Sequence, residues 1–254
     1  MIKGLYSAFT AMDAAWKYQD VLANNIANSD TVGFKREVGA MQSFPDVLLS
    51  QQTSVPAPIA ARIQGVVGQI GTGKFVAEFS TDFQQGSFQQ TKEELDFALD
   101  AGFFAVRALD GEPFYTRAGR FQRDDNNDLV TTAGYYVLGQ DGQPINLGNE
   151  PGEVLVSADG VITSRTQELG RLQVVDFTPA DLRRAGEAYF RATNPGQQID
   201  GAVRQGVIER SNSELTEDMT TMVAVQRTYQ ANQSVISQLD QSLELATAQL
   251  GRWR

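Results

Sequence analysis

The chain has 254 residues, a formal net charge of −10, and neither cysteine nor histidine. An acidic chain is not expected to bind nucleic acid, because that function requires a basic face. The missing residue types exclude disulfide bonds, thiolate sites and any catalytic arrangement that uses histidine.

Residues 1–33 are predicted to form an N-terminal helix that Gly33 ends. The apolar residues of this stretch recur at alternating steps of three and four, which is the spacing of a coiled-coil seam. The seam consists of Ile2, Leu5, Phe9, Met12, Trp16, Ala23 and Ile26. Charged residues interrupt the same stretch, and they make it unlike a cleaved secretion signal. We therefore expect a chain that stays in the cytoplasm or leaves it by a route without a cleaved signal.

Three asparagines, Asn24, Asn25 and Asn28, lie on the last turns of this helix. Asparagine is a poor helix former, and each one costs several tenths of a kcal/mol relative to alanine. Its amide both donates and accepts hydrogen bonds, and a buried asparagine can fix the register of packed helices. We expect these side chains to bond helix ends of neighbouring subunits. The alternative is that they are ordinary helical residues and that Asn28 only ends the helix.

Residues 34–69 are predicted to form an extended connector. Pro45, Pro56 and Pro58 interrupt this segment, and residues before proline favour extended conformations. A short helix near residues 46–50 is compatible with the pattern.

Residues 70–206 are predicted to form an antiparallel β domain that is inserted between the two ends of the chain. Apolar runs flank the pairs Asp110-Gly111, Asp141-Gly142 and Asp159-Gly160, and each pair is a hairpin signal.

Residues 207–254 are predicted to form a C-terminal helix, because no glycine or proline occurs between Ser213 and Leu250. Ser211 and Glu214 have the spacing of a capping box at its start. At 1.5 Å per residue the helix would reach about 55 Å. Its apolar stripe contains Leu215, Met222, Val225, Tyr229, Ile236, Leu239, Leu243, Ala246 and Leu250.

The predicted fold class is therefore α+β. A discontinuous α-helical coiled-coil domain comes from both termini, and an antiparallel β domain is inserted between them. The two stripes most simply pack on each other and on copies from neighbouring subunits. The predicted subunit-interface residues are Asn24, Asn25, Asn28, Leu5, Phe9, Met12, Met222, Tyr229, Ile236, Leu239 and Leu243.

Three short motifs partly match known chemical sites. GQIGTGKF, residues 68–75, lacks the hydroxyl residue and the following helix of a phosphate-binding loop. The acidic turn at residues 124–128 lacks the glycine and the closing glutamate of a calcium loop. The acidic run at residues 93–96 has the residue types of a glycosidase pair, but nothing places two carboxylates across a cleft. We therefore expect that the chain is not an enzyme and binds no cofactor and no metal. The sequence contains no run of about 18 apolar residues, so we expect no transmembrane helix.

The sequence resembles the bacterial flagellar rod and hook proteins. ANNIANSDTVGFKR, residues 23–36, is similar to their N-terminal signature, and residues 211–236 are similar to their C-terminal signature. Between these ends, IGTG, QQGSFQQTKEELDFAL, GFFAVRALDGEPFYTRAGRF and LVTTAGYYVLG follow the pattern of the family in order. Two local departures are the turn DDNND and the absence of a glycine in LDFALDAGFF. The length suits a rod protein of the proximal or distal type, and both types remain open.

The resemblance implies a subunit of the flagellar basal-body rod. Such a subunit is exported unfolded through the flagellar export apparatus, without a cleaved signal. It polymerises helically around a central channel, its terminal helices form the inner tube, and the rod crosses the periplasm and transmits torque. Its partners would be copies of itself and other rod and hook proteins. The alternatives are a non-polymerising adaptor or cap of the rod or hook, and an enzyme that acts on the cell wall.

Overall fold

The computed structural model describes residues 2–45, 47–50, 66–71, 73–148, 154–164, 167–200 and 202–251. The chain divides into two compact units, and each unit is assembled from separate stretches of sequence. The helical unit takes in the described parts of 1–24, 37–80 and 216–254, and the β unit takes in those of 25–36 and 81–215. The segment expected to be a connector thus belongs largely to the helical unit, whereas the sequence analysis divided the chain at residues 34 and 70.

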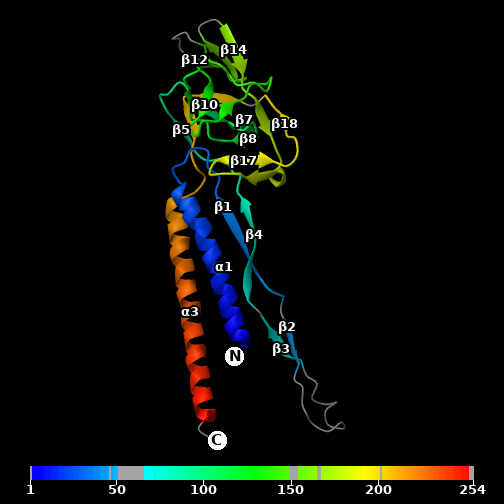
Figure 1. Ribbon diagram of the computed structural model, residues 1–254, viewed down its shortest axis with the longest axis vertical. Coiled ribbons are helices and arrows are strands. Elements are labelled where there is room, and N and C mark those ends of the chain that lie inside the picture. Colours follow the sequence, from blue (N-terminus) through cyan, green and yellow to red (C-terminus); the bar gives the residue numbers. More distant parts are fainter. Residues whose placement is uncertain are drawn as a thin grey trace. The chain divides into compact units, whose positions relative to one another are not determined.

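Two long helices dominate the helical unit. Helix α1 spans Ile2–Ala27 and helix α3 spans Leu215–Gly251. They lie side by side and run in opposite directions, so that both chain termini lie at the same end of the pair (Figure 1). Ala15, Leu22 and Val225 form a buried cluster between them, against which Tyr18, Met222 and Tyr229 pack.

Within one chain, the buried face of α1 is shifted by one position from the predicted seam. Ala15 and Leu22 are buried, whereas Phe9 and Trp16 are 61% and 55% exposed. Small side chains at a helix contact allow the two axes to approach closely, and large ones hold them apart. The face that contains Ala15 therefore packs, whereas Phe9 and Trp16 of the predicted stripe stay exposed and Leu5, Met12 and Ile26 are partly buried.

The predicted stripe of α3 faces α1 over part of its length. Val225 is buried, and Met222, Tyr229, Ile236 and Leu239 are partly buried. Leu243 is 39% exposed.

The start of α3 differs from the predicted capping box, because the helix begins only at Leu215. The Ser211 hydroxyl oxygen instead accepts a hydrogen bond from the backbone N–H of Ser213 at 3.1 Å. Ser211 therefore stabilises a turn before the helix.

Extended strands accompany the helices in the helical unit. Strands β1 (Glu37–Ser43) and β4 (Lys74–Thr81) pair, and β2 (Val47–Ser50) pairs antiparallel with β3 (Val66–Ile70). The short helix considered for residues 46–50 is wrong for Val47–Ser50, because this short apolar run bonds to a second apolar run in β3. Asp46 and residues 51–65 lie outside the described residues.

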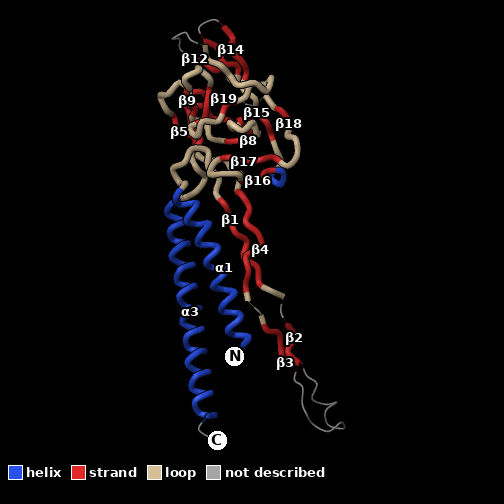
Figure 2. Tube along the Cα trace, in the orientation of Figure 1, coloured by secondary structure: helices blue, strands red, loops and turns tan. Residues whose placement is uncertain are grey.

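The β unit is built from short antiparallel strands (Figure 2). Its largest sheet has the order β16-β17-β8-β7-β11-β10-β9, with β15 beside β7 and β18 beside β15. A three-stranded sheet has the order β12-β13-β14, and two pairs join β6 to β19 and β5 to β20. The strands are β5 (Phe88–Gln90), β6 (Phe97–Leu99), β7 (Phe103–Arg107), β8 (Pro113–Thr116), β9 (Phe121–Arg123), β10 (Leu129–Thr131), β11 (Tyr136–Val137), β12 (Val154–Val156), β13 (Val161–Ser164), β14 (Gln167–Arg171), β15 (Val174–Asp176), β16 (Leu182–Arg184), β17 (Tyr189–Ala192), β18 (Gln197–Gln198), β19 (Val203–Gln205) and β20 (Val207–Glu209), with a short 3-10 helix at Pro179–Asp181.

The predicted Asp-Gly turns are present. Gly111 lies in the turn between β7 and β8, and Gly160 lies in the turn between β12 and β13. Both glycines have a positive φ, of 90° and 78°, which other residues rarely adopt. The hairpin signals of the sequence are therefore confirmed at these positions.

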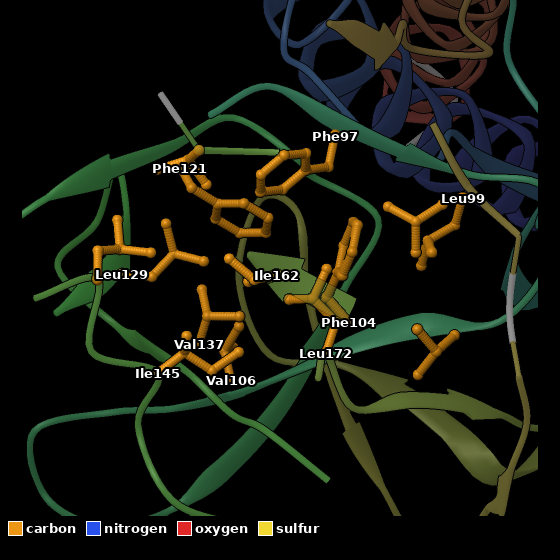
Figure 3. Packing of buried hydrophobic residues seen from close by; sticks show 14 of the residues in the cluster. Phe97, Leu99, Phe104, Val106, Phe121, Leu129, Val137, Ile145, Ile162 and Leu172 are labelled. Atoms are coloured by element: carbon orange, nitrogen blue, oxygen red, sulfur yellow. The ribbon is translucent and has the colours of Figure 1, made fainter. Parts of the chain in front are cut away.

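The β unit has its own hydrophobic core, to which several strands contribute (Figure 3). Phe104 is fully buried, and its ring meets that of Phe121 edge-on with centroids 5.1 Å apart. Leu129 and Ile162 are also fully buried in this cluster. The core draws on residues from β6 to β19, so it forms only when strands far apart in the sequence have paired.

We expect Leu129→Ala to lower the free energy of unfolding by about 2–5 kcal/mol, because it opens a cavity at a fully buried site. The same change at Leu155, which is 51% exposed, serves as the control and should cost about 0.5 kcal/mol or less. Equilibrium urea unfolding followed by circular dichroism measures both values. Equal losses for the two variants would contradict this placement of the core.

Candidate functional site

The segment that follows helix α1 and the segment that precedes helix α3 meet inside the β unit at a cluster of buried charges. The side chains of Lys35 and Glu209 are each only 1% exposed, and they form an ion pair with 2.6 Å between Lys35 Nζ and Glu209 Oε1. Arg117 lies 3.2 Å from the second carboxylate oxygen. We call residues 25–36, 81–86 and 207–213, together with Arg117, the junction.

Backbone groups complete the hydrogen bonding of this charge cluster. Lys35 Nζ also donates to the carbonyl oxygen of Gln84 at 2.7 Å, and the N–H of Gly86 donates to Glu209 Oε1 at 2.9 Å. A buried ion pair is tolerated only where such additional bonds offset the loss of water. Burial lowers the pKa of Lys35 below its usual value, and the Glu209 carboxylate opposes that shift.

Gly33 allows the junction to close. Its φ is +67°, and its N–H donates to the Glu209 carbonyl oxygen at 2.8 Å. A Cβ atom at this position would lie 2.2 Å from the backbone nitrogen of Ala118. Helix α1 ends six residues earlier, at Ala27. Gly33 therefore allows two backbones to approach closely. The prediction that Gly33 ends the N-terminal helix is wrong, since the helix ends at Ala27.

The residues that flank Lys35 are also held in place. Phe34 is fully buried, with the Arg184 guanidinium 4.8 Å from the centroid of its ring. The backbone N–H of Arg36 donates to Asn212 Oδ1 at 2.7 Å. Asn212 in turn donates to the carbonyl oxygen of Asp82 at 2.8 Å. Asn212 thus bridges two segments, one directly after Lys35 and the other before β5.

The junction gathers all the points at which the chain crosses between the two units. These crossings follow residues 24, 36, 80 and 215. Beside them, Ser213 Oγ donates to the carbonyl oxygen of Asn25 at 3.2 Å, and the N–H of Asp82 donates to that of Arg36 at 2.9 Å. The β unit therefore holds together the four chain segments that lead into the helical unit.

The three asparagines fall into two classes. Asn25 and Asn28 are 2% and 6% exposed within a single chain, whereas Asn24 is exposed. Asn28 Oδ1 accepts a hydrogen bond from Thr31 Oγ1 at 3.0 Å, directly after helix α1 ends. This geometry favours the alternative that Asn28 ends the helix. The fold of one chain accounts for the burial of Asn25 and Asn28. A bond to a neighbouring subunit stays a prediction for all three asparagines.

Large exposed apolar residues are concentrated on the two helices. Nine of the fourteen that the described residues contain lie on α1 or α3: Tyr6, Phe9, Trp16, Leu215, Met219, Val223, Val235, Leu243 and Leu245. Of the other predicted interface residues, Leu5 and Met12 are partly buried. We call the nine exposed residues on α1 and α3 the apolar helix surface. It is the candidate functional site of the chain, because large apolar side chains that one chain leaves exposed on its helices can be buried when chains associate.

The sequence analysis missed the junction. Lys35 and Glu209 are 174 positions apart, and no local pattern relates them. Glu209 directly follows Ile208 in a strand-like run. Strand alternation would place its side chain on the exposed face, so no signal in the sequence indicates that this acid is buried.

The short motifs considered as chemical sites have local structural roles. Asp124 Oδ1 accepts hydrogen bonds from the N–H groups of Asn126 and Asp128, which makes the acidic run a turn. Lys74 begins strand β4 instead of a helix. Among the residues that the structure describes, no group of three acidic, cysteine or histidine residues is placed to hold a metal ion. In the same part of the chain, no helix is long and apolar enough to span a membrane.

Three protein-family models match separate parts of the chain. Residues 5–35 match "Flagella basal body rod protein", residues 100–164 match "Flagellar hook protein FlgE/F/G D1 domain", and residues 204–250 match "Flagellar basal body rod FlgEFG protein C-terminal". The first and third matches include Lys35 and Glu209.

Curated relatives align over nearly the whole chain. The flagellar basal-body rod protein FlgG of Bacillus subtilis is 33% identical, over 96% of this chain and 97% of the relative. The flagellar hook-basal body complex protein FlhO of the same organism is 32% identical, over 99% and 100%. The flagellar basal-body rod protein FlgF of Caulobacter vibrioides is 31% identical, over 99% and 98%.

Glu209→Gln removes the anion of the junction and leaves Lys35 and Arg117 without their buried partner. We expect a loss of about 3–5 kcal/mol in the free energy of unfolding. Glu112→Gln is the control, because Glu112 pairs with Arg191 at a half-exposed site, and it should cost at most about 1 kcal/mol. Urea unfolding of both variants measures the difference. A loss for Glu209→Gln no larger than the control would refute the structural role of the junction.

Asn25→Ala is expected to destabilise the isolated chain. The change gains up to about 0.7 kcal/mol of helix propensity, but it leaves the buried groups around Asn25 without a polar partner, at a cost of about 1–3 kcal/mol. Asn24→Ala, at the neighbouring exposed position, should be neutral or slightly stabilising. Thermal unfolding of dilute monomer compares the two changes. A stabilised Asn25→Ala monomer would show that the polar group is not needed within one chain.

Proposed function

The chain belongs to the family of bacterial flagellar rod and hook proteins, as a structural subunit of the basal-body rod, and on this basis we propose that it polymerises helically through its terminal helices. In the proposed assembly, α1 and α3 of successive subunits form a tube around a channel. The rod then acts as the drive shaft that transmits torque across the periplasm. Its direct partners are copies of itself and other rod and hook proteins.

The apolar helix surface is the observation that supports this proposal. Burying a large apolar side chain stabilises an association by about 1.5–3 kcal/mol relative to leaving it exposed. Phe9 follows Tyr6 by three residues and Trp16 follows Phe9 by seven, so these side chains share one face of α1. A monomer gains nothing from this arrangement, whereas a tube of packed helices covers it.

Both helices contribute to this surface, and that favours polymerisation over the adaptor alternative. Met219 and Val223 are each 49% exposed one helical turn apart on α3. An adaptor needs one contact surface, but a subunit inside a polymer meets neighbours on several sides. Apolar faces on α1 and on α3 supply separate surfaces for separate neighbours.

The β unit suits the transmission of torque. A shaft transmits torque only if each subunit resists deformation. The buried ion pair of Lys35 and Glu209 and the aromatic core around Phe104 join distant parts of the chain in one unit. Folded subunits of this kind would carry force between the helices of one layer and the next.

The proposed export route fits the composition of the chain. We propose that the flagellar export apparatus secretes the chain unfolded and without a cleaved signal. A chain with no cysteine cannot be trapped by disulfide bonds during passage or in the periplasm. The fold is then completed after export, when residues 203–213 reach their partners in the β unit.

Trp16→Glu is expected to abolish rod formation and motility, because it places a charge on the apolar helix surface, where an unpaired ion is strongly disfavoured after assembly. The monomer should keep its stability, since Trp16 is 55% exposed in the single chain. Electron microscopy of basal bodies and swimming assays measure the effect.

Leu109→Glu is the control for this experiment. Leu109 is 78% exposed on the β unit, and the change is expected to leave rods intact. Normal rods from the Trp16→Glu chain would refute the helix surface as the assembly site, while a soluble chain that joins existing rods without polymerising would support the adaptor.

A further inference from the structure

Methionine is the only sulfur-containing residue type of the chain, which has five methionines and no cysteine. Thiols and thioethers are the side-chain groups that a peroxide oxidises, and without thiols only the thioethers remain. Among the methionines whose side chains the structure describes, Met12 and Met222 are partly buried, whereas Met219 is 49% exposed. Met219 is therefore the described methionine that an oxidant in solution reaches most easily.

Met219 lies in a row of exposed apolar side chains on α3. Leu215 precedes it by four residues and Val223 follows it by four, so the three share one side of the helix. Leu215 is 44% exposed and Val223 is 49% exposed, and both belong to the apolar helix surface. Neither side chain carries a hydrogen-bond donor. A polar atom introduced at Met219 thus finds water in the free chain but no side-chain partner along this row.

Met222, three residues further along α3, has a different environment. It packs against the buried cluster of Ala15, Leu22 and Val225 between the two helices. A polar group at Met222 would disturb the contact between α1 and α3, whereas the same change at Met219 leaves that contact intact. The two methionines therefore separate an effect on association from an effect on the fold of one chain.

We propose that Met219 is a reversible oxidation site, at which a peroxide converts the free chain from an assembling form to a non-assembling form. Hydrogen peroxide transfers one oxygen atom to the Met219 sulfur. The O–O bond breaks, an S–O bond forms and the sulfur gives up two electrons, while the second oxygen takes the proton of the transferred hydroxyl and leaves as water. The product is a polar sulfoxide, which methionine sulfoxide reductases convert back to the thioether.

The effect on assembly rests on the proposed polymerisation, in which the apolar helix surface becomes buried. The sulfoxide oxygen then loses its water, and Leu215 and Val223 offer it no donor. Burying a polar group without a hydrogen-bond partner is unfavourable, so the oxidised chain associates less well. In the free chain the sulfoxide stays in contact with water, because Met219 is half-exposed there. Oxidation at this site therefore weakens association and leaves the fold of the single chain stable.

The first measurement treats the full-length, unassembled chain with hydrogen peroxide. We expect mass spectrometry of its peptides to find sulfoxide at Met219 several-fold sooner than at Met222, because exposure controls access to the sulfur. At the stage where Met219 is oxidised and Met222 is not, the melting temperature of the chain should be unchanged. Equal oxidation rates of the two methionines, or a lower melting temperature at that stage, would overturn the assignment of Met219.

The second measurement follows the yield of rods in cells by electron microscopy of basal bodies. Met219→Gln imitates the polar, unbranched sulfoxide, and Met219→Leu keeps an apolar side chain of similar volume that a peroxide does not oxidise. Both replacements are good helix formers, so neither weakens α3 itself. We expect the yield to fall several-fold for Met219→Gln and to stay normal for Met219→Leu. Normal rods from the Met219→Gln chain would show that a polar group is tolerated at this site and would overturn the inference.

Cells treated with sublethal hydrogen peroxide supply the last comparison. We expect the yield of new rods to fall several-fold for the wild-type chain and much less for Met219→Leu. Met222→Leu is the matched control, and it should respond as the wild type does. An equal loss for Met219→Leu and the wild type overturns the inference alone. A wild-type chain that forms no rods without peroxide instead overturns the proposed polymerisation, and the effect of oxidation on assembly fails with it.

Discussion

The buried ion pair between Lys35 and Glu209 is the constraint on which the arrangement of the chain depends. Two charges that are each 1% exposed survive in the interior only because Arg117 and backbone groups complete their hydrogen bonding. Removing either partner would leave a buried charge, so the segment after α1 and the segment before α3 stabilise each other. Gly33 supports this pairing, because any side chain at its position would collide with the backbone at Ala118.

The junction separates the part of the chain that stabilises the fold from the part that we propose to assemble. Within the β unit, rings such as Phe104 and Phe121 fill a core that needs no second copy. Within the helical unit, small residues such as Ala15 form the contact between α1 and α3, and Trp16 stays exposed. In the proposed rod, the large apolar side chains that the single chain leaves exposed on its helices would pack against neighbouring subunits.

The sequence by itself determined the elements whose signals are local: the two terminal helices, the Asp-Gly hairpins of the β domain, and the resemblance that the comparisons confirm. Turn residues and apolar spacing act over a few positions, so they can be read without a fold. Of the candidate surface, Phe9, Trp16, Leu215 and Leu243 were found as members of apolar stripes. Tertiary structure alone decided that Ala15 packs instead of Trp16, because a heptad pattern defines a stripe but not which edge of it contacts the partner helix. It also decided that Val47–Ser50 forms a strand and that Lys35 meets Glu209, because those outcomes depend on residues brought together from distant parts of the chain.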